Sequence, residues 1–313
     1  EPYREPIYAI AERLRDTASY RECYVDLAMQ IERELELPVH FARITVLGQR
    51  DTFAFEERQH LVAFTEAIEK DQREAAHEII LVRTKSVWRH EPERAQIWKV
   101  AERCMAFLNV ADRIGQQWTT EARSVGEMVA AYAREGGWSE LDRHQRLMEQ
   151  SIAECTACEQ LENVITRCRA RYREVIDVIQ KRFLKAVEET AWPPEGVLRH
   201  SQVFDRFIAP ALAARERVAY VLADSLRFEM GQDLAGALSS LGETDVQLVA
   251  ASLPTVTSVG MAALMPGADG ALTLREVGEE LIPHLGGQRV NIVADRTKIL
   301  TERLGDRIVD IEI

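Results

Sequence analysis

The sequence predicts a two-part protein of the α plus α/β class, with an α-helical region over residues 1–195 and a parallel-sheet α/β part over residues 196–313. In the first part, apolar residues recur at spacings of three and four, which is typical of amphipathic helices. The stretch from Ala191 to Gly196 contains two prolines and a glycine, which mark a boundary. Beyond it, two strand-like apolar runs each lead directly into a helical pattern, and this order is typical of a parallel sheet.

The helical pattern of residues 1–36 predicts a helix that Pro38 ends, because proline disrupts a helix interior. The weak alternation of Phe41–Leu47 fits a short strand or an extended loop. Phe55–Lys70 is again helical. The run from His77 to Trp88 contains four consecutive aliphatic residues, and periodicity alone leaves strand and buried helix both open.

From Pro92 a long helix is predicted, with one apolar face that runs from Ile97 to Ile114. A further helix over 125–132 ends at Gly136 and Gly137. Ser139 then begins the longest periodic segment, which reaches Trp192 and contains no proline or glycine. Fifty residues of helix would span about 75 Å. This segment is predicted to be a helical arm or part of an antiparallel bundle, with a break near residues 156–163 as the alternative.

Composition limits the functions that the chain can have. The 313 residues carry a formal net charge of −12, which argues against sequence-independent binding of nucleic acid but leaves room for a local basic site. No apolar run reaches 18 residues and no secretory signal opens the chain, so we expect a cytoplasmic protein that does not bind membranes. The chain begins with Glu1 and ends on a strand-like run, which indicates a segment of a longer protein.

The five cysteines form no disulfide-rich pattern, which suits a reducing compartment. Cys155 and Cys158 have the spacing of a zinc knuckle, but they lie in a helical run without a second pair. We therefore expect them to be ordinary core or surface residues. The arginines of residues 167–173 fit a solvated helix face better than a partner surface.

The α/β part begins near Arg217. Val218–Ala223 and 246–251 read as strands that are buried on both faces, and 289–294 as a third, parallel to them. A helix is expected over 297–304 and a fourth strand over 307–313. Thr257 or Ser258 can cap the helix after the second strand. Asp224 and Thr257 would then lie at the carboxyl edge of one sheet, where parallel sheets hold their ligands.

Two motifs carry a family resemblance. The stretch ADSLRFE contains Asp224, and after a link it is followed by SLPTVTSVGMAALMP, which contains Thr257. Together they resemble the PglZ domain of BREX and Pgl phage-resistance systems, a branch of the alkaline-phosphatase superfamily. The sharp match covers about fifty residues, from Val218 to Pro266. The resemblance implies that the C-terminal part is the first half of an alkaline-phosphatase-like domain.

The resemblance also assigns roles to residues. Asp224 would bind a divalent metal, and Thr257 would bind the metal and attack phosphorus, with the helix N-terminus there receiving the phosphoryl oxygens. Thr255 competes with Thr257 for this role. Arg227 could contact phosphate or pair with Glu229. The simpler interpretation of Asp224 and Thr257 is that each caps a helix.

The implied function is a metal-dependent phosphohydrolase or phosphodiesterase of anti-phage defence. The resemblance implies zinc, with manganese or magnesium as alternatives, other BREX or Pgl proteins as partners, and a phosphate-containing substrate that could be nucleic acid. A second hypothesis is a catalytically idle scaffold whose helical region docks other defence components. A third, a signalling protein, lacks support because no receiver domain is found. After Thr257 the chain offers few further ligands, and the fragment alone is expected to be inactive; those few are Asp269, His284, Asp295, Asp306 and Asp310.

Overall fold

The computed structural model describes residues 4–41 and 51–308. Contacts divide the chain into a first unit, Glu1–Thr120 with Glu140–Lys181, and a second unit, Glu121–Ser139 with Arg182–Ile313. The chain therefore passes between the units three times. The predicted division at residues 195 and 196 stays a prediction. No described helix is both long enough and apolar enough to cross a bilayer.

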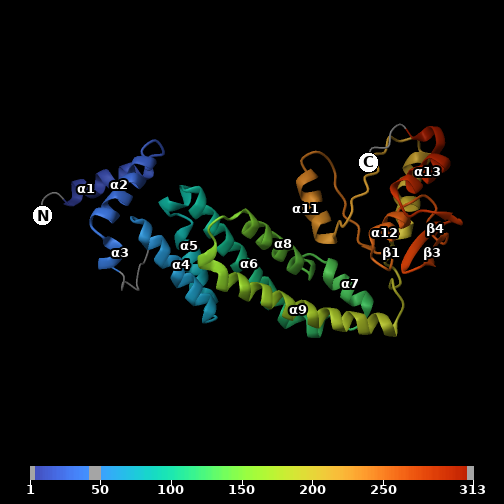
Figure 1. The fold of residues 1–313 in the computed structure, drawn as a ribbon, viewed down its shortest axis with the longest axis horizontal. Coiled ribbons are helices and arrows are strands. Elements are labelled where there is room, and N and C mark those ends of the chain that lie inside the picture. The colour runs from blue at the N-terminus through green and yellow to red at the C-terminus, as the bar shows by residue number, and fades with distance from the viewer. Residues whose placement is uncertain (1–3, 42–50, 309–313) are drawn as a thin grey trace. The chain divides into compact units, whose positions relative to one another are not determined.

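Helices build the described part of the first unit (Figure 1). They are α1 (Arg4–Asp16), α2 (Arg21–Glu34), α3 (Leu37–His40), α4 (Ala54–Glu69), α5 (Arg73–Arg83), the 3-10 helix η1 (Val87–His90), α6 (Pro92–Glu121), α8 (Ser139–Glu154), the 3-10 helix η2 (Glu159–Leu161) and α9 (Glu162–Glu189), which continues into the second unit. The predicted helix over residues 1–36 is thus two helices joined by a turn. Residues 42–50, where a strand or loop is predicted, lie outside the described part.

The aliphatic run near residue 80 belongs to α5 and not to a strand. It buries Ala76 and Ile80 on one face, while Leu81 stays exposed on the other. Separately, Trp88 of η1 is fully buried in a cluster with Tyr24, Ala28 and neighbouring residues of α2 and α4. This cluster joins α1 and α2 to the remainder of the first unit.

The long helices α6, α8 and α9 pack against one another. The rings of Phe107 on α6 and Tyr172 on α9 lie 6.4 Å apart. The hydroxyl of Tyr172 donates a hydrogen bond of 2.8 Å to Asp142 on α8. The contact positions on α6 and α9 are fully buried, among them Phe107 and Cys168. The bundle alternative for this segment is therefore the one that forms.

The arginines of α9 are mostly used in ion pairs within the unit. Arg167 pairs with Asp71 at 3.1 Å and Arg169 with Glu149 at 2.7 Å. Arg171 pairs with Asp112 of α6 at 3.1 Å. These arginines hold α9 against its neighbours, so the partner-surface interpretation loses its basis.

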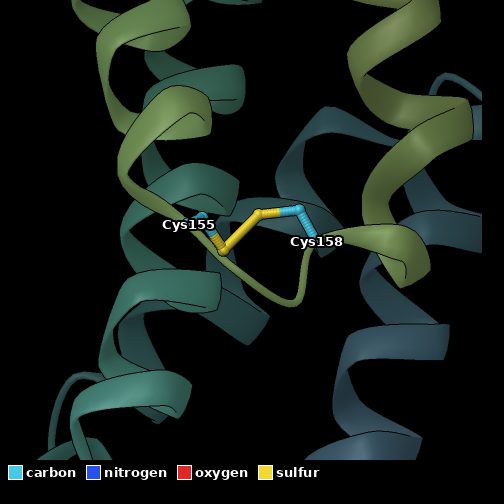
Figure 2. The surroundings of a disulfide bond; sticks show 2 residues. All are labelled: Cys155 and Cys158. Atoms are coloured by element: carbon cyan, nitrogen blue, oxygen red, sulfur yellow. A yellow bond between two sulfur atoms is a disulfide. The ribbon is translucent and has the colours of Figure 1, made fainter.

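The predicted continuous helix is interrupted: α8 ends at Glu154, and α9 begins at Glu162. Cys155 and Cys158 lie in the connection between the two helices and form a disulfide (Figure 2). The expectation of ordinary helical cysteines is thus wrong. The interruption lies where the alternative prediction placed a break, near residues 156–163, and that alternative is confirmed.

The second unit combines short helices with two small sheets (Figure 1). Its elements are α7 (Val125–Ala133), β1 (Leu198–Arg199), the 3-10 helix η3 (His200–Gln202), the π-helical η4 (Phe204–Ile208), α10 (Ala209–Ala213), α11 (Phe228–Leu238), β2 (Val249–Ala250), α12 (Thr257–Ala263), β3 (Leu272–Val277), β4 (Glu280–Leu285), β5 (Gln288–Arg289), α13 (Val293–Leu304) and the 3-10 helix η5 (Gly305–Arg307).

A parallel sheet forms, but it is much smaller than predicted. It consists of β1 and β2, with Leu198 opposite Val249. The run Val218–Ala223 is extended without being a strand of this sheet, and Val221 is 82% exposed. Instead, Tyr220 donates a hydrogen bond to the Leu264 carbonyl and Leu222 packs into a core below. The apolar run 218–223 predicted a strand that is buried on both faces. In the structure, other described residues pack against only one face of this segment.

The region after α12 differs most from the prediction. β3, β4 and β5 form an antiparallel sheet with two-residue turns at Gly278-Glu279 and Gly286-Gly287. All three glycines have positive φ, as such hairpin turns require. The predicted strand over 289–294 is wrong beyond Arg289, because α13 begins at Val293. Of the strand predicted over 307–313, Arg307 ends the 3-10 helix η5, and 309–313 lies outside the described residues.

Candidate functional site

The two sequence motifs meet at one pair of side chains. The Thr257 hydroxyl donates a hydrogen bond of 3.2 Å to Asp224 Oδ2, across 33 positions of sequence. Both residues are exposed. The structure therefore brings together the carboxylate and the hydroxyl that the sequence singled out, in a position that solvent can reach.

Packing explains why the pair meets. Tyr220 and Leu222 anchor the extended segment before Asp224, one to the end of α12 and the other to the core that α12 shares with α13. Asp224 is followed by Ser225, whose φ of 56° turns the chain away from the extended direction. The core cluster consists of Ala262, Met265, Ala268, Leu285, Val290 and Ile299. Asp224 is thus held next to the start of α12.

Neither residue does what the simpler interpretation proposed. Thr257 is the first residue of α12, whose N-cap is Val256, and no side chain caps that helix. The N-cap of α11 is Arg227, again without a side-chain cap, so Asp224 does not cap it. Thr255 is exposed, and its side chain makes no hydrogen bond to another described residue. However, α12 has only seven residues, and so short a helix gives little support for the expected binding of phosphoryl oxygens at its N-terminus.

Arg227 forms an ion pair with Glu229 at 2.9 Å. Glu229 is fully buried, whereas the Arg227 side chain is 48% exposed. Of the two uses that the sequence left open for Arg227, pairing with Glu229 is the one present in this structure. A buried carboxylate needs such a partner, because an uncompensated charge away from water is costly.

Arg296 is a neighbour of the pair that sequence reasoning missed. It lies in the first turns of α13, and its Nη1 donates a hydrogen bond of 3.1 Å to the Asn291 carbonyl. Burial lowers the pKa of Arg296, while the charges of Asp295 and Asp224 oppose that shift. Arg296 therefore places positive charge near Asp224. No motif marks it, because its position depends on where α13 begins.

His200 lies against α12 one turn after Thr257. A Cβ built at Gly260 would lie 3.5 Å from Cε1 of the His200 ring. Burial lowers the pKa of His200, and its Nδ1 is buried without a hydrogen-bond partner in the described part. An alanine at position 260 would make only an ordinary van der Waals contact with the ring, so the approach does not depend on a glycine there. No motif marks His200, because it precedes both motifs in the chain.

The described residues provide only part of a metal site. Asp224 and Thr257 offer two oxygen donors, which suit a hard divalent cation. Within the described residues, however, no group of three or more His, Cys, Asp or Glu could hold a metal. The later acids serve elsewhere: Asp269 accepts hydrogen bonds from Ser201 and Gln202, and Asp295 accepts two backbone N–H groups before α13.

Comparison with known proteins concerns the segment that contains both motifs. Residues 203–310, which contain both motifs, match the family described as the BREX system PglZ alkaline phosphatase-like domain. The chain is also 31% identical over 85 residues to the alkaline phosphatase-like protein PglZ of Bacillus cereus (strain H3081.97). That match covers 26% of this chain and 10% of the relative, so the chain spans only a small part of that protein. No solved structure matches. The family resemblance of the two motifs is thereby confirmed.

Proposed function

We propose that this chain is part of a metal-dependent phosphohydrolase or phosphodiesterase that serves anti-phage defence in a BREX or Pgl system. The observation that carries the proposal is the hydrogen bond between Thr257 and Asp224. It joins the two motifs of a domain whose family is alkaline phosphatase-like. Each side chain lacks the capping role that would otherwise account for it.

The roles follow from chemistry. A threonine hydroxyl is a weak nucleophile at neutral pH and needs activation. Thr257 is the proposed nucleophile, and Asp224 is the proposed metal ligand that lies beside it. A divalent cation bound there would lower the pKa of the hydroxyl and offset charge on the phosphoryl group. The two oxygen donors do not discriminate zinc from manganese or magnesium, and the remaining ligands would come from residues outside the described part.

Arg296 and Arg227 have different proposed tasks. Arg296 interacts electrostatically with Asp224. It would orient that carboxylate or contact a phosphoryl oxygen. Arg227 would contact phosphate only by giving up its pair with Glu229. The partners would be other components of the defence system, and the location would be the cytoplasm. Nucleic acid stays a possible substrate, although a chain charge of −12 requires a local basic site to hold it.

A catalytically idle scaffold is the second candidate. The observation that favours it is the lack of a third metal ligand near Asp224 and Thr257 among the described residues. In that case the first unit would dock other defence components, and the hydrogen-bonded pair would be a remnant of an active ancestor.

The test uses the full-length protein with p-nitrophenyl phosphate and bis(p-nitrophenyl) phosphate, each with zinc, manganese or magnesium. Thr257→Ala should lower kcat by at least about a thousandfold, and Thr257→Ser should retain part of the activity. Asp224→Asn should weaken metal binding in a calorimetric titration. Thr255→Ala is the matched control, an exposed threonine two positions away, and should act like the parent.

If Thr257→Ala turns over at the parent rate, the nucleophile assignment is wrong and Thr255 becomes the candidate. If the parent hydrolyses neither substrate with any of the three metals and binds none of them, the scaffold candidate is the better one.

A further inference from the structure

We propose that the first unit contains a second binding site, for a phosphorylated small molecule, in a pocket between α1, the start of α2 and the end of α5. The pocket has a volume of about 410 Å³. Its key residues are Arg21, Arg83 and Lys85. The site goes beyond the proposed function, since all of its residues belong to the first unit and none belongs to the two motifs.

Cations outnumber acids in the lining of this pocket. Arg15, Arg21, Arg83 and Lys85 face it together with Asp16 and Asp51, and His90 of η1 completes the titratable groups there. Such an excess stands out in a chain whose net charge is −12. A local positive potential in a concave site attracts anions, and low-dielectric walls strengthen that attraction.

The acids of the pocket are already engaged. Arg15 pairs with Asp16 at 2.9 Å and with Asp51 at 3.4 Å. Asp51 also accepts a hydrogen bond of 3.2 Å from the Val87 backbone N–H. These contacts hold α1 and η1 in place and leave little free carboxylate to neutralise the remaining cations.

Arg21 and Lys85 are the cations without an acid partner among the described residues. The Nε of Arg21 reaches only the Arg15 carbonyl, at 3.4 Å, and Lys85 is exposed. The net attraction for an anion therefore comes from these two side chains. Arg83 adds no net charge, because its Nη1 pairs at 2.7 Å with the buried Glu57.

Arg83 contributes an independent observation. It is 1% exposed, yet it is one of the residues that line the pocket. Its Nε is buried and has no hydrogen-bond partner in the described part of the chain. A buried donor without a partner costs about 1–3 kcal/mol. Solvent does not reach this Nε in the structure, so an acceptor oxygen of a ligand would satisfy it only if the Arg83 side chain shifts toward the pocket.

The chemistry favours phosphate over other anions. A guanidinium fork with an ammonium group suits the several oxygens of a phosphate, and cations disfavour a metal ion. The volume falls in the range of small-molecule sites. Leu81, Val82 and Val87 add an apolar wall that can contact the organic part of the ligand. A nucleoside monophosphate, free or at a strand end, has both features.

The experiment titrates the 313-residue chain with inorganic phosphate, AMP and a 5′-phosphorylated oligonucleotide at constant ionic strength, with binding followed by calorimetry. The variant Arg21→Ala/Lys85→Ala should lower the affinity for phosphate and for AMP at least about tenfold. The control Arg13→Ala/Lys181→Ala removes the same charge from exposed positions outside the pocket and should bind like the parent.

Tighter binding of AMP than of inorganic phosphate supports a small-molecule site, and tighter binding of the oligonucleotide than of AMP overturns that ligand class. No binding by the parent at millimolar phosphate and AMP, or an equal loss in both double variants, overturns the site. The four substituted residues are at least partly exposed, so both double variants should fold. Circular dichroism checks this.

Discussion

Thr257 and Asp224 are joined by a hydrogen bond although both side chains are exposed to solvent. Water competes for each partner of an exposed hydrogen bond, so the bond contributes little to folding. A contact that stability does not require, between residues of two separate motifs, is better explained by chemistry than by architecture.

This relationship predicts that substitutions at the pair leave the fold intact. Thr257→Val and Asp224→Asn should each change the free energy of unfolding by less than about 0.5 kcal/mol, because the residues are surface positions. Urea unfolding followed by circular dichroism measures this. A loss above about 2 kcal/mol would show that the pair is structural, and any loss of activity would then need another explanation.

The buried ion pair of Glu57 and Arg83 predicts the opposite behaviour. Glu57 also accepts hydrogen bonds from Ser86 and, at 2.8 Å, from Trp98 Nε1. Glu57→Ala should destabilise the first unit by about 3–5 kcal/mol, because it leaves Arg83 buried and uncompensated. Glu57→Leu/Arg83→Met should be less destabilised than Glu57→Ala.

Urea unfolding of these variants checks the prediction. Glu56 is a useful comparison on the same helix, since its carboxylate accepts the Phe53 backbone N–H at 2.9 Å and Glu56→Gln keeps an acceptor there. If Glu57→Ala costs no more than Glu56→Gln, the charge network contributes nothing to the unit.

The disulfide between Cys155 and Cys158 predicts a difference in thiol count. Of the five cysteines, Cys23, Cys104 and Cys168 are free. Ellman titration of the denatured chain should give three thiols without reductant and five with it. A short cross-linked loop limits the gain, so reduction should lower the free energy of unfolding by about 2 kcal/mol. Cys155→Ser/Cys158→Ser should match the reduced parent, and equal stability with the oxidised parent would rule out a contribution from the bond.

Two half-buried histidines predict how stability depends on pH. Burial lowers the pKa values of His144 and His200 below the ordinary 6.5. As pH falls below 6.5, the unfolded chain therefore binds protons that the folded chain does not yet bind, and stability decreases. The stability is fully present above pH 6.5, and its loss is complete once the pH passes below the lowered pKa values of the folded state.

Thermal unfolding between pH 8 and pH 5 measures this dependence. His200→Asn should reduce the decrease, because one of the two groups no longer titrates, and His144→Asn should do the same. The double variant His144→Asn/His200→Asn should show the smallest decrease of the series, because both groups are then absent. An unchanged slope in His200→Asn would contradict the prediction.

Local rules found most helices from the sequence, and α4 and α6 bury the apolar faces that their spacing indicates. The spacing also predicted α11, although Leu234 and Leu238 stay exposed there. The pairing of strands was harder. The βα order predicted three parallel strands, but Val218–Ala223 finds no partner among the described residues. Which strands pair depends on residues that are distant in the sequence. An apolar run indicates only that its own residues avoid water, and it does not identify the partner strand. The hairpin was available locally, since Gly286-Gly287 is a strong turn signal.

The site divides in the same way. Motifs identified Asp224 and Thr257, because the chemistry needs these residue types at this point of the chain. Arg296 and His200 could not be found, since their approach depends on how α13 and η3 pack on α12. The disulfide was not predicted because Cys155 and Cys158, three positions apart, also fit one face of a helix.

The segment of residues 121–139 has a consequence for inheritance and for protein engineering. It belongs with the C-terminal residues, where Tyr132 of α7 lies 6.2 Å from the ring of Phe228. A single recombination after Pro193 and Pro194 would therefore transfer residues 196–313 without α7. Phe228 would then lose its contact with Tyr132 and become more exposed. Exchange between related genes should preserve the whole stretch from α7 onward, and a trimmed expression fragment should keep it too.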